Sequence, residues 1–232
     1  MVKVLSVGGS IIVPNNPDVE FLSNFVLMVT EWLEEDKNRR LILVAGGGAP
    51  ARVYQNAYNE VASKIGAKAD ANAADWIGIM ATRINAQLLK ASFGSYCKDD
   101  VVYNPTEENL QFTGQVLVAS GWKPGFSTDT DAVYLGEKFG AKTIVNLSNI
   151  EKVYTDDPRK NLNAKPLDSI SWADFRKMTG DEWTPGKNCP FDPIASKKAS
   201  QLGMKVICAG GKNIPNIKAI LNEREYVGTT IG

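Results

Sequence analysis

Two glycine clusters are the first residues in this sequence whose types and spacing could do chemistry. Gly8-Gly9-Ser10 follows the apolar residues 2–7, and Gly46-Gly47-Gly48 follows the apolar residues 41–45. Glycine lets a backbone approach a ligand closely, so that N–H groups converge on phosphate oxygens. Both clusters leave predicted strands at the carboxyl end, which favours an anion site at one edge of a sheet. A purely structural role is the alternative, and neither cluster matches the phosphate-loop or dinucleotide fingerprints.

An acidic segment between residues 127 and 158 is the second candidate. Asp129 opens a predicted amphipathic helix, residues 143–148 form an apolar run typical of a buried strand, and a polar loop follows. That loop ends at Asp157-Pro158, where a helix cannot continue. A helix, a strand and a binding loop in this order indicate a nucleotide-binding kinase.

Histidine is absent from the sequence. This excludes Ser-His-Asp and Cys-His nucleophile systems and histidine-ligated zinc. Phosphoryl transfer fits the restriction, because its barrier is lowered mostly by positioning and by cations near the transferring oxygens.

Charge and hydropathy limit the partners. The 26 acidic and 26 basic residues balance, so no basic field would hold nucleic acid or an anionic membrane. No apolar run approaches the roughly 18 residues of a spanning helix, and the first residues lack the features of a signal peptide. We therefore expect a soluble, cytoplasmic protein. Cys97, Cys189 and Cys208 lack metal-ligand spacing, and we expect buried or incidental thiols.

Strand and helix patterns alternate along the chain, which predicts a mainly parallel sheet covered on both faces. The expected fold class is therefore α/β, a three-layer αβα sandwich. Predicted strands occupy residues 2–7, 41–45, 116–119, 143–148, 204–208 and 227–231. Predicted helices include one with Asn16 as N-cap and Pro17 at its first position, one over residues 75–89, one capped by Asp192 and one over residues 214–221.

The pattern weakens between residues 169 and 188. Trp172, Phe175 and Met178 share one face of a predicted short helix, and Gly180, Pro185 and Gly186 then mark a loop. We expect this loop to be a lid, with a plain surface excursion as the alternative.

Several segments, in order, carry a resemblance to a known family. Residues 149–158 resemble the segment that wraps the adenine and ribose of ATP in the amino acid kinase superfamily. Further segments are similar to uridylate (UMP) kinases of the archaeal type; these are residues 7–18, 45–52, 75–89, 124–129, 192–197 and 228–231. The resemblance covers nearly the whole chain and implies a single amino acid kinase domain over residues 1–232. Residues from 1 to about 135 would form an acceptor-binding lobe, and residues from about 136 to 232 an ATP-binding lobe.

The resemblance implies transfer of the γ-phosphate of ATP to UMP, giving UDP and ADP in pyrimidine nucleotide synthesis. Mg²⁺ is expected, held mainly through phosphates with no direct protein ligand. Members of this type form homo-hexamers, as trimers of dimers, and a helix over residues 17–36 would carry much of the dimer contact. Its apolar residues fit that role: Phe21, Leu22, Phe25, Val26, Val29, Trp32 and Leu33 on one face, with Leu27 and Met28 off its centre. The alternative is that all of them pack within their own subunit.

The resemblance also assigns roles to residues that match the family's motifs. For the acceptor, Gly47, Gly48 and Arg52 would hold the phosphate of UMP, Asp75 the ribose hydroxyls, and the loop from Gly121 to Thr128 the uracil. For the donor, Gly8, Gly9 and Ser10 would receive the β and γ phosphates, and Asn149, Tyr154 and Asp157 would line the ATP site. Lys197 would place a cation at the transferring phosphoryl group, and Asp129 would orient cationic groups or magnesium-bound water. Asp75 could instead be a plain N-cap, Arg52 and Lys197 solvated charges, and Trp122 and Phe126 core aromatics rather than contacts of the base.

The sequence departs from the family at three places. Ser6 stands where most members have a lysine, Glu151-Lys152 replaces Asp-Gly, and Asp131 occupies an apolar position. Because lysine takes a positive φ less readily than glycine, we expect the ATP loop to differ in shape. Asp131 either favours the helix N-terminus or joins a metal site.

Two other functions stay open. One is a non-catalytic nucleotide or oxyanion binder on the same fold, as in molybdate storage proteins, which Ser6 and Lys152 keep in play. The other is a kinase of another small phosphate or carboxylate. Isopentenyl phosphate kinases use a histidine, so the lack of histidine counts against that branch.

Overall fold

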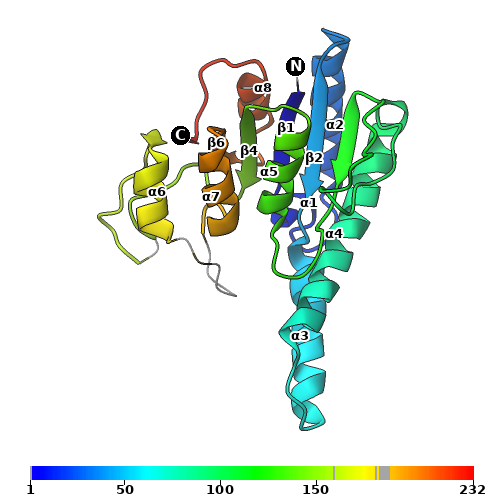
Figure 1. Ribbon diagram of the computed structural model, residues 1–232, viewed down its shortest axis with the longest axis vertical. Helices are drawn as coiled ribbons and strands as arrows, with labels where there is room; N and C mark the ends of the chain where they lie inside the picture. Colours follow the sequence, from blue (N-terminus) through cyan, green and yellow to red (C-terminus); the bar gives the residue numbers. More distant parts are fainter. Residues whose placement is uncertain (1, 159, 181, 183–188) are drawn as a thin grey trace.

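A seven-stranded sheet forms the centre of the computed structural model. The structure describes residues 2–158, 160–180, 182 and 189–232. The order of its strands is β3-β2-β1-β4-β6-β7-β5 (Figure 1). The strands are β1 (Val2–Val7), β2 (Arg40–Ala45), β3 (Val116–Ala119), β4 (Thr143–Ser148), β5 (Ser169–Ile170), β6 (Lys205–Gly210) and β7 (Thr229–Ile231). The five strands from β3 to β6 in this order are parallel, and β7 pairs antiparallel with β6. This confirms the predicted mainly parallel sheet.

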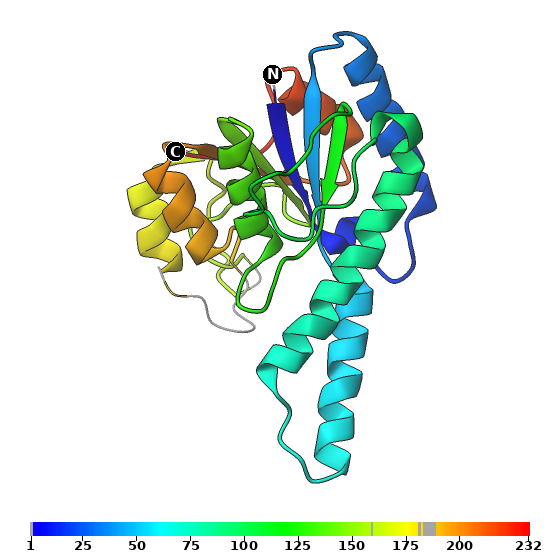
Figure 2. The same cartoon turned by 45° about the vertical axis from the view of Figure 1, so that its right-hand side comes forward.

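Helices cover both faces of the sheet, so the molecule has the three predicted layers (Figures 1 and 2). Side chains of one strand alternate between two apolar cores, Leu5 in the first and Val4 in the second. The first core lies against α1 (Gly9–Ile12), α2 (Val19–Glu34), α8 (Ile214–Leu221) and the second half of α4 (Ala71–Phe93). The second core lies against α5 (Thr128–Lys138), α6 (Trp172–Thr179) and α7 (Pro193–Gln201).

The start of α2 differs from the prediction. Asn16 and Pro17 do not begin the helix; Asp18 is the N-cap, and its carboxylate accepts a hydrogen bond of 3.0 Å from the N–H of Phe21. Asp18 also pairs with Lys212, so a tertiary contact favours it over the neighbouring cap candidates. Met28, predicted to lie off the centre of the apolar face, is buried, whereas Val26, predicted to lie on that face, is only partly buried.

Two other predicted helices are present, but with different bounds or exposed faces. Residues 75–89 belong to the longer helix α4, which is capped by Asp70 rather than by Asp75. The predicted short helix is α6, with Phe175 buried, but Met178 faces solvent instead of sharing its face. The predicted lid falls largely on residues 181 and 183–188, which lie outside the described residues.

Helices α3 (Gly48–Lys64) and α4 form a long antiparallel hairpin that projects well beyond the sheet (Figures 1 and 2). The second half of α4 returns to the body and packs on β2 and β3, and the 3-10 turn Gly94–Tyr96 ends it. In the described part of the chain, no helix is both long and apolar enough to cross a bilayer.

The turns after β1 and β2 touch backbone to backbone. A Cβ atom on Gly9 would lie 2.0 Å from the N atom of Gly48, and one on Gly46 would lie 2.4 Å from the N atom of Gly9. Gly48 also has a φ of +68°, a region that side-chain-bearing residues rarely adopt. The two glycine clusters of the sequence therefore form one packed unit, in which glycine is required by space.

Gly9→Ala is expected to prevent stable folding or to lower the free energy of unfolding by more than about 4 kcal/mol, because backbone on both sides blocks the new methyl group. Gly66→Ala is the matched control, since Gly66 has a φ of +70° but open space around it. Its cost should stay near the ~1 kcal/mol of a left-handed residue. Urea unfolding followed by circular dichroism compares the variants, and equal losses would contradict the packed unit.

Candidate functional site

The chain reverses its direction of sheet growth between β1 and β4. Strands β1, β2 and β3 extend the sheet one way, and β4 then returns to the other side of β1. Loops at the carboxyl ends of β1 and β4 consequently diverge, which opens a crevice for ligands in sheets of this kind. The N–H of Gly8 donates to the carbonyl of Leu147 at 2.8 Å, so the turn after β1 is fixed to β4 at this point.

The glycine turns open two helices that have no side-chain cap. Gly8 is the N-cap of α1 and Gly47 that of α3, and neither position offers a side-chain oxygen. At the start of α3 the N–H of Ala49 donates to the carbonyl of Val13 at 3.0 Å and Pro50 has no N–H, so the backbone donors left for an anion there are those of Gly47 and Gly48. At the start of α1 the corresponding donors are the N–H groups of Gly9 and Ser10, which precede the first hydrogen bond of the helix. Phosphate sites are predicted at these turns, at Gly8, Gly9, Gly47 and Gly48, and this stays a prediction.

Arg52 joins the two predicted phosphate sites. It lies one turn into α3, is exposed, and its Nη1 is 3.4 Å from the hydroxyl of Ser10 in α1. The predicted acceptor-phosphate residue thus contacts the predicted donor-phosphate loop. A guanidinium here can offer parallel N–H groups to phosphate oxygens.

Asp75 lies in the second turn of α4, partly exposed, and its Oδ2 accepts a hydrogen bond of 3.2 Å from the N–H of Gly125. The alternative role as an N-cap is wrong, because Asp70 caps this helix. Asp75 instead connects α4 to the loop after β3, the loop predicted to surround the base.

The segment between β3 and the N-cap of α5, residues 120–126, is called the acceptor loop below. It overlaps the loop from Gly121 to Thr128 that is predicted to surround the base. Its Gly121 N–H donates to Thr82 Oγ1 at 2.8 Å. Trp122 and Phe126 pack against each other with ring centroids 4.8 Å apart and ring planes tilted by 51°. Lys123 Nζ lies 3.9 Å from the Trp122 centroid. The aromatic rings thus pack together with a cation in the unliganded loop. Thr128 follows as the first residue of α5 and is partly exposed.

Asp129 connects three elements. Its Oδ1 accepts from the hydroxyl of Ser6 in β1 at 2.9 Å, and its Oδ2 accepts from the N–H of Asp192, the N-cap of α7, at 3.3 Å. Burial, with a smaller contribution from the nearby Asp192, raises the pKa of Asp129 to about 6, although the hydrogen bonds from Ser6 and from the backbone of Asp192 act to lower it. Ser6 therefore supplies a hydrogen-bond donor at the place where most family members have a lysine.

Lys197 is exposed in the second turn of α7 and has no ion pair among the described residues. Its neighbour Lys198 differs, because it pairs with Glu137 at 2.7 Å and lies 4.9 Å from the ring centroid of Tyr134. Of these two lysines, only Lys197 has an ammonium group that no described contact occupies.

The predicted ATP loop follows β4. Asn149 is exposed at its start, Tyr154 forms an isolated antiparallel bridge with Pro166, and Asp157 is partly exposed. Lys152 pairs with Asp168. Its φ is negative, because Glu223 is the one described non-glycine residue with a positive φ. The replacement of glycine by Lys152 therefore imposes no left-handed strain on the loop.

Asp131 is fully buried in the first turn of α5. Its Oδ2 accepts from the N–H of Trp122 at 3.2 Å, and its Oδ1 has no partner within the described residues. Burial raises the pKa of Asp131 to about 8, with smaller contributions from Asp129 and Asp192. No described group of three or more acidic, cysteine or histidine residues is suited to hold a metal ion, so the metal-site alternative for Asp131 is not supported.

Two residues of α4 were missed as site residues. The buried Asn85 donates through Nδ2 to the carbonyls of Gly46 at 2.7 Å and Gly47 at 3.1 Å. Thr82, one turn earlier, holds Gly121. The available signal was two polar residues spaced three apart among the apolar residues that α4 buries, which include Ile79, Ala86 and Leu89.

The free energy of unfolding should fall as pH rises from 5 to 7, and Asp131→Asn should remove part of this fall. In the unfolded chain Asp131 is ionised above its ordinary pKa of 3.8, whereas the folded chain keeps the proton until the pH nears 8. The folded state then binds more protons, so acid favours it, by up to about 1.4 kcal/mol per pH unit. Urea midpoints at several pH values measure the slopes. Equal slopes for both proteins would show that folded Asp131 is already ionised.

Known proteins resemble this chain in sequence and in fold. The sequence model of the Amino acid kinase family matches residues 1–210. A uridylate kinase from Pyrococcus abyssi is 34% identical over 231 residues, covering 98% of each chain. The crystal structure of uridylate kinase from Archaeoglobus fulgidus has 30% identity and a TM-score of 0.81 over 100% of both chains. UMP kinase from Bacillus anthracis, at 18% identity and a TM-score of 0.75, covers 100% of this chain and 95% of its own and shares the fold. This chain belongs to the amino acid kinase family.

Proposed function

We propose that this protein is a UMP kinase that transfers the γ-phosphate of ATP to UMP. The observation that carries the proposal is the contact between Arg52 and Ser10, which brings the acceptor-phosphate and donor-phosphate residues together where two uncapped helices begin. The relatives named uridylate kinase, similar over the whole chain, support UMP as the acceptor.

The reaction needs positioning and charge stabilisation more than acid–base chemistry. An oxygen of the UMP phosphate bonds to the γ-phosphorus while the bond from that phosphorus to the bridging oxygen breaks, and ADP leaves with the electron pair. The acceptor phosphate is already an anion, so no general base is required. The helix N-termini at Gly8 and Gly47, Arg52 and Lys197 would hold the two phosphates in line and stabilise the charge that develops.

Magnesium would act mainly through the phosphates. A cation of this kind needs few protein ligands, because phosphate oxygens and water fill most of its coordination positions. When bound, Mg²⁺ would supply positive charge that offsets the charge of the phosphates. Asp129, held by Ser6 and by the backbone of Asp192, would orient a water of its hydration shell.

The two predicted lobes would divide the substrates between them. Residues 1–135 contain Arg52, Asp75 and the acceptor loop, and residues 136–232 contain the loop after β4 and helix α7 with Lys197. Asn149, Tyr154 and Asp157 would line the adenosine part of ATP. One continuous sheet joins the lobes, which supports a single domain.

Ser6 favours the second candidate, an oxyanion or nucleotide binder without turnover, because it replaces a cation with a hydroxyl. A coupled assay of ADP release with UMP, CMP, isopentenyl phosphate and acetylglutamate separates the candidates. UMP should give the highest kcat/KM. Nucleotide binding without ADP release would favour the binder, and a different preferred acceptor would favour another kinase.

Asp75→Ala should weaken UMP binding by about tenfold or more, because it removes a ribose acceptor and the contact with Gly125. ATP binding should stay nearly unchanged. Asp70→Ala, which removes an acid and a helix cap from the same helix, is the matched control. Calorimetry with each nucleotide measures the effect, and equal losses for UMP and ATP would refute the division of roles.

Lys197→Ala should lower kcat by about a hundredfold or more, in line with the loss of one preorganised electrostatic group. Lys198→Ala, one residue away on the same helix, should change kcat only a few fold, because its charge is already used by Glu137. Steady-state rates of both variants are measured with saturating UMP and ATP. Similar rates for the two variants would mean that Lys197 is a surface charge.

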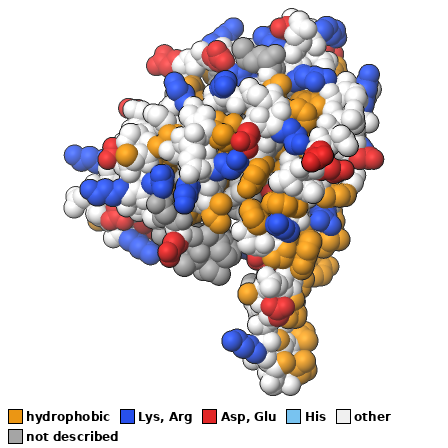
Figure 3. Space-filling model, viewed as in Figure 1, with side chains coloured by type: hydrophobic (Ala, Val, Ile, Leu, Met, Phe, Trp, Pro, Cys, Tyr) orange, Lys and Arg blue, Asp and Glu red, His pale blue; other side chains and the backbone are white. Residues whose placement is uncertain are grey.

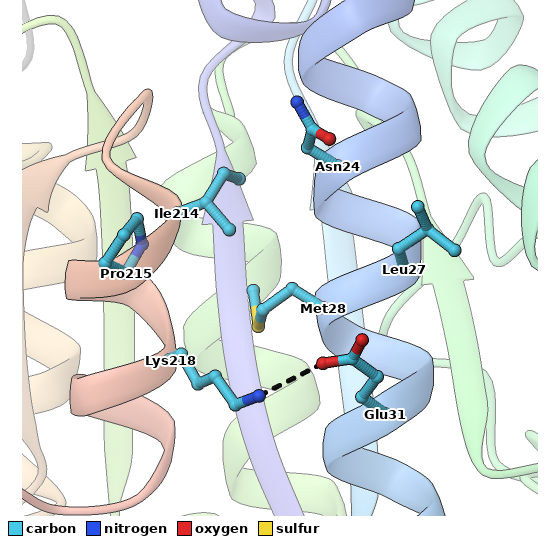
Figure 4. A pocket seen from close by; sticks show the side chains of 7 residues that line it. All are labelled: Asn24, Leu27, Met28, Glu31, Ile214, Pro215 and Lys218. Atoms are coloured by element: carbon cyan, nitrogen blue, oxygen red, sulfur yellow. Dashed lines mark hydrogen bonds and ion pairs between the residues drawn. The ribbon is translucent and has the colours of Figure 1, made fainter.

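We also propose a homo-hexamer, but the structure alters the surface expected to build it. Most apolar residues of α2 pack within their own subunit, and Leu27 remains exposed at the edge of an open groove of about 460 Å³ between α2 and α8 (Figure 4). Lys218 and Glu31 pair at 3.1 Å across this groove. The α2 surface is therefore partly charged.

The α3–α4 hairpin exposes much more apolar surface (Figure 3). Its exposed large residues are Val53, Tyr54, Val61, Ile65, Trp76, Met80 and Ile84. They recur at helical spacing on each helix, and Trp76 lies beside Arg83, with the guanidinium carbon 5.7 Å from the ring centroid. Tyr, Trp and Arg are the residues most enriched at interface hot spots. The hairpin thus supports subunit contacts better than α2 does.

Light scattering at micromolar concentration should give a mass near six chains of 25.2 kDa. Ile84→Glu should lower this mass, because Ile84 is 70% exposed and belongs to the apolar surface of the hairpin. Leu27→Glu tests the α2 surface in the same way. A monomeric wild-type protein would refute the hexamer, and dissociation by Leu27→Glu alone would return the main contact to α2.

A further inference from the structure

Asp131 is a buried acid without a cationic partner among its described contacts. The charged groups that face it are Asp129, from the same helix, and Asp192, at the start of α7, and both are also acids. A carboxyl in such surroundings keeps its proton at neutral pH, in agreement with its raised pKa. Burying a carboxyl group costs free energy unless hydrogen bonds compensate for the lost water. The hydrogen bonds of Asp131 therefore indicate its role.

The contact that the structure describes is with the acceptor loop. Oδ2 of Asp131 accepts the N–H of Trp122 at 3.2 Å. The same loop is held at Gly121 by Thr82 and at Gly125 by Asp75, both from α4. Asp131 is thus the one anchor of the three that comes from α5, on the other side of the loop.

The anchored residue carries the aromatic cluster of the loop. Trp122 packs against Phe126 with the ring planes tilted, lies edge-on to Tyr134 with ring centroids 6.2 Å apart, and supports Lys123 on its face. The backbone position of Trp122 therefore sets where these rings and this cation stand relative to Asp75. An apolar residue at position 131 would leave the N–H of Trp122 without this acceptor, and the loop would lose its anchor on α5.

We propose that Asp131 is a positioning residue that fixes the acceptor loop through the Trp122 N–H and thereby sets which nucleobase the acceptor site takes. Its carboxyl is inaccessible, so it acts through the loop rather than by touching the substrate. The proposal rests on the proposed function, in which this loop surrounds the base of UMP.

The kinetic test compares Asp131→Asn, which keeps an accepting oxygen, with Asp131→Leu, which does not. We expect Asp131→Leu to raise KM for UMP about tenfold and to reduce the preference for UMP over CMP in kcat/KM by a similar factor, the size of one lost hydrogen bond. KM for ATP should change by less than about twofold. Asp131→Asn should restore the wild-type values.

Asn216→Leu is the matched control for a buried polar residue replaced by an apolar one. Asn216 lies on α8, away from the acceptor loop, and its side chain binds the backbone of Val227. Its replacement should not change the ratio of kcat/KM for UMP to kcat/KM for CMP. Equal changes in KM for UMP and ATP, or an Asn variant that behaves like the Leu variant, would overturn the proposal.

Hydrogen exchange of the Trp122 amide tests the anchor without depending on the Leu variant or on activity. The amide should be protected in the wild-type protein and in Asp131→Asn, because both keep the acceptor. Exchange as fast as that of an unbonded, exposed amide in the wild-type protein would overturn the proposal. A wild-type protein that protects this amide but does not phosphorylate UMP would instead overturn the proposed function and leave the anchor in place.

Discussion

The close contact between the turns after β1 and β2 is the constraint on which the site depends. Gly9 meets Gly46 and Gly48 at distances that no side chain allows. Helices α1 and α3 begin from this contact, so their uncapped N-termini are brought to one place. Neither turn could approach the other this closely if its glycines carried side chains.

Helix α4 holds this arrangement together from outside the sheet. Asn85 binds the carbonyls of the second glycine turn, Thr82 binds Gly121, and Asp75 binds Gly125. One rigid element therefore positions both the phosphate end and the base end of the proposed acceptor site. On the opposite face of the sheet, Asp129 has the corresponding role, since it joins β1, α5 and the start of α7.

The sequence predicts the elements better than the contacts between them. Apolar runs locate β1, β2 and β4, and glycine clusters locate the turns after β1 and β2, because these features are local. The cap of α2 is missed because Asp18 is selected by Lys212, which lies far away in the chain. Asn85 is missed for the same reason, since its partner Gly46 is 39 residues away. Helical spacing could not show that Asp131 faces the interior, because its position on α5 is compatible with solvent until the acceptor loop covers it.

The regular rise of α4 sets the distance between the two ends of the proposed acceptor site, at Asp75 and at Asn85. Between Asp75 and Asn85 the helix advances about 15 Å, and each added residue would shift the two ends by about 1.5 Å and turn one against the other by about 100°. An insertion or deletion within this stretch would therefore turn one set of contacts away from the site. Beyond Asp75, toward the hairpin tip, the chain is free of this restriction. The number of residues can vary at the tip of the hairpin. Between Asp75 and Asn85 it cannot, because both residues must reach their partners, Gly125 and the turn after β2, at the same time.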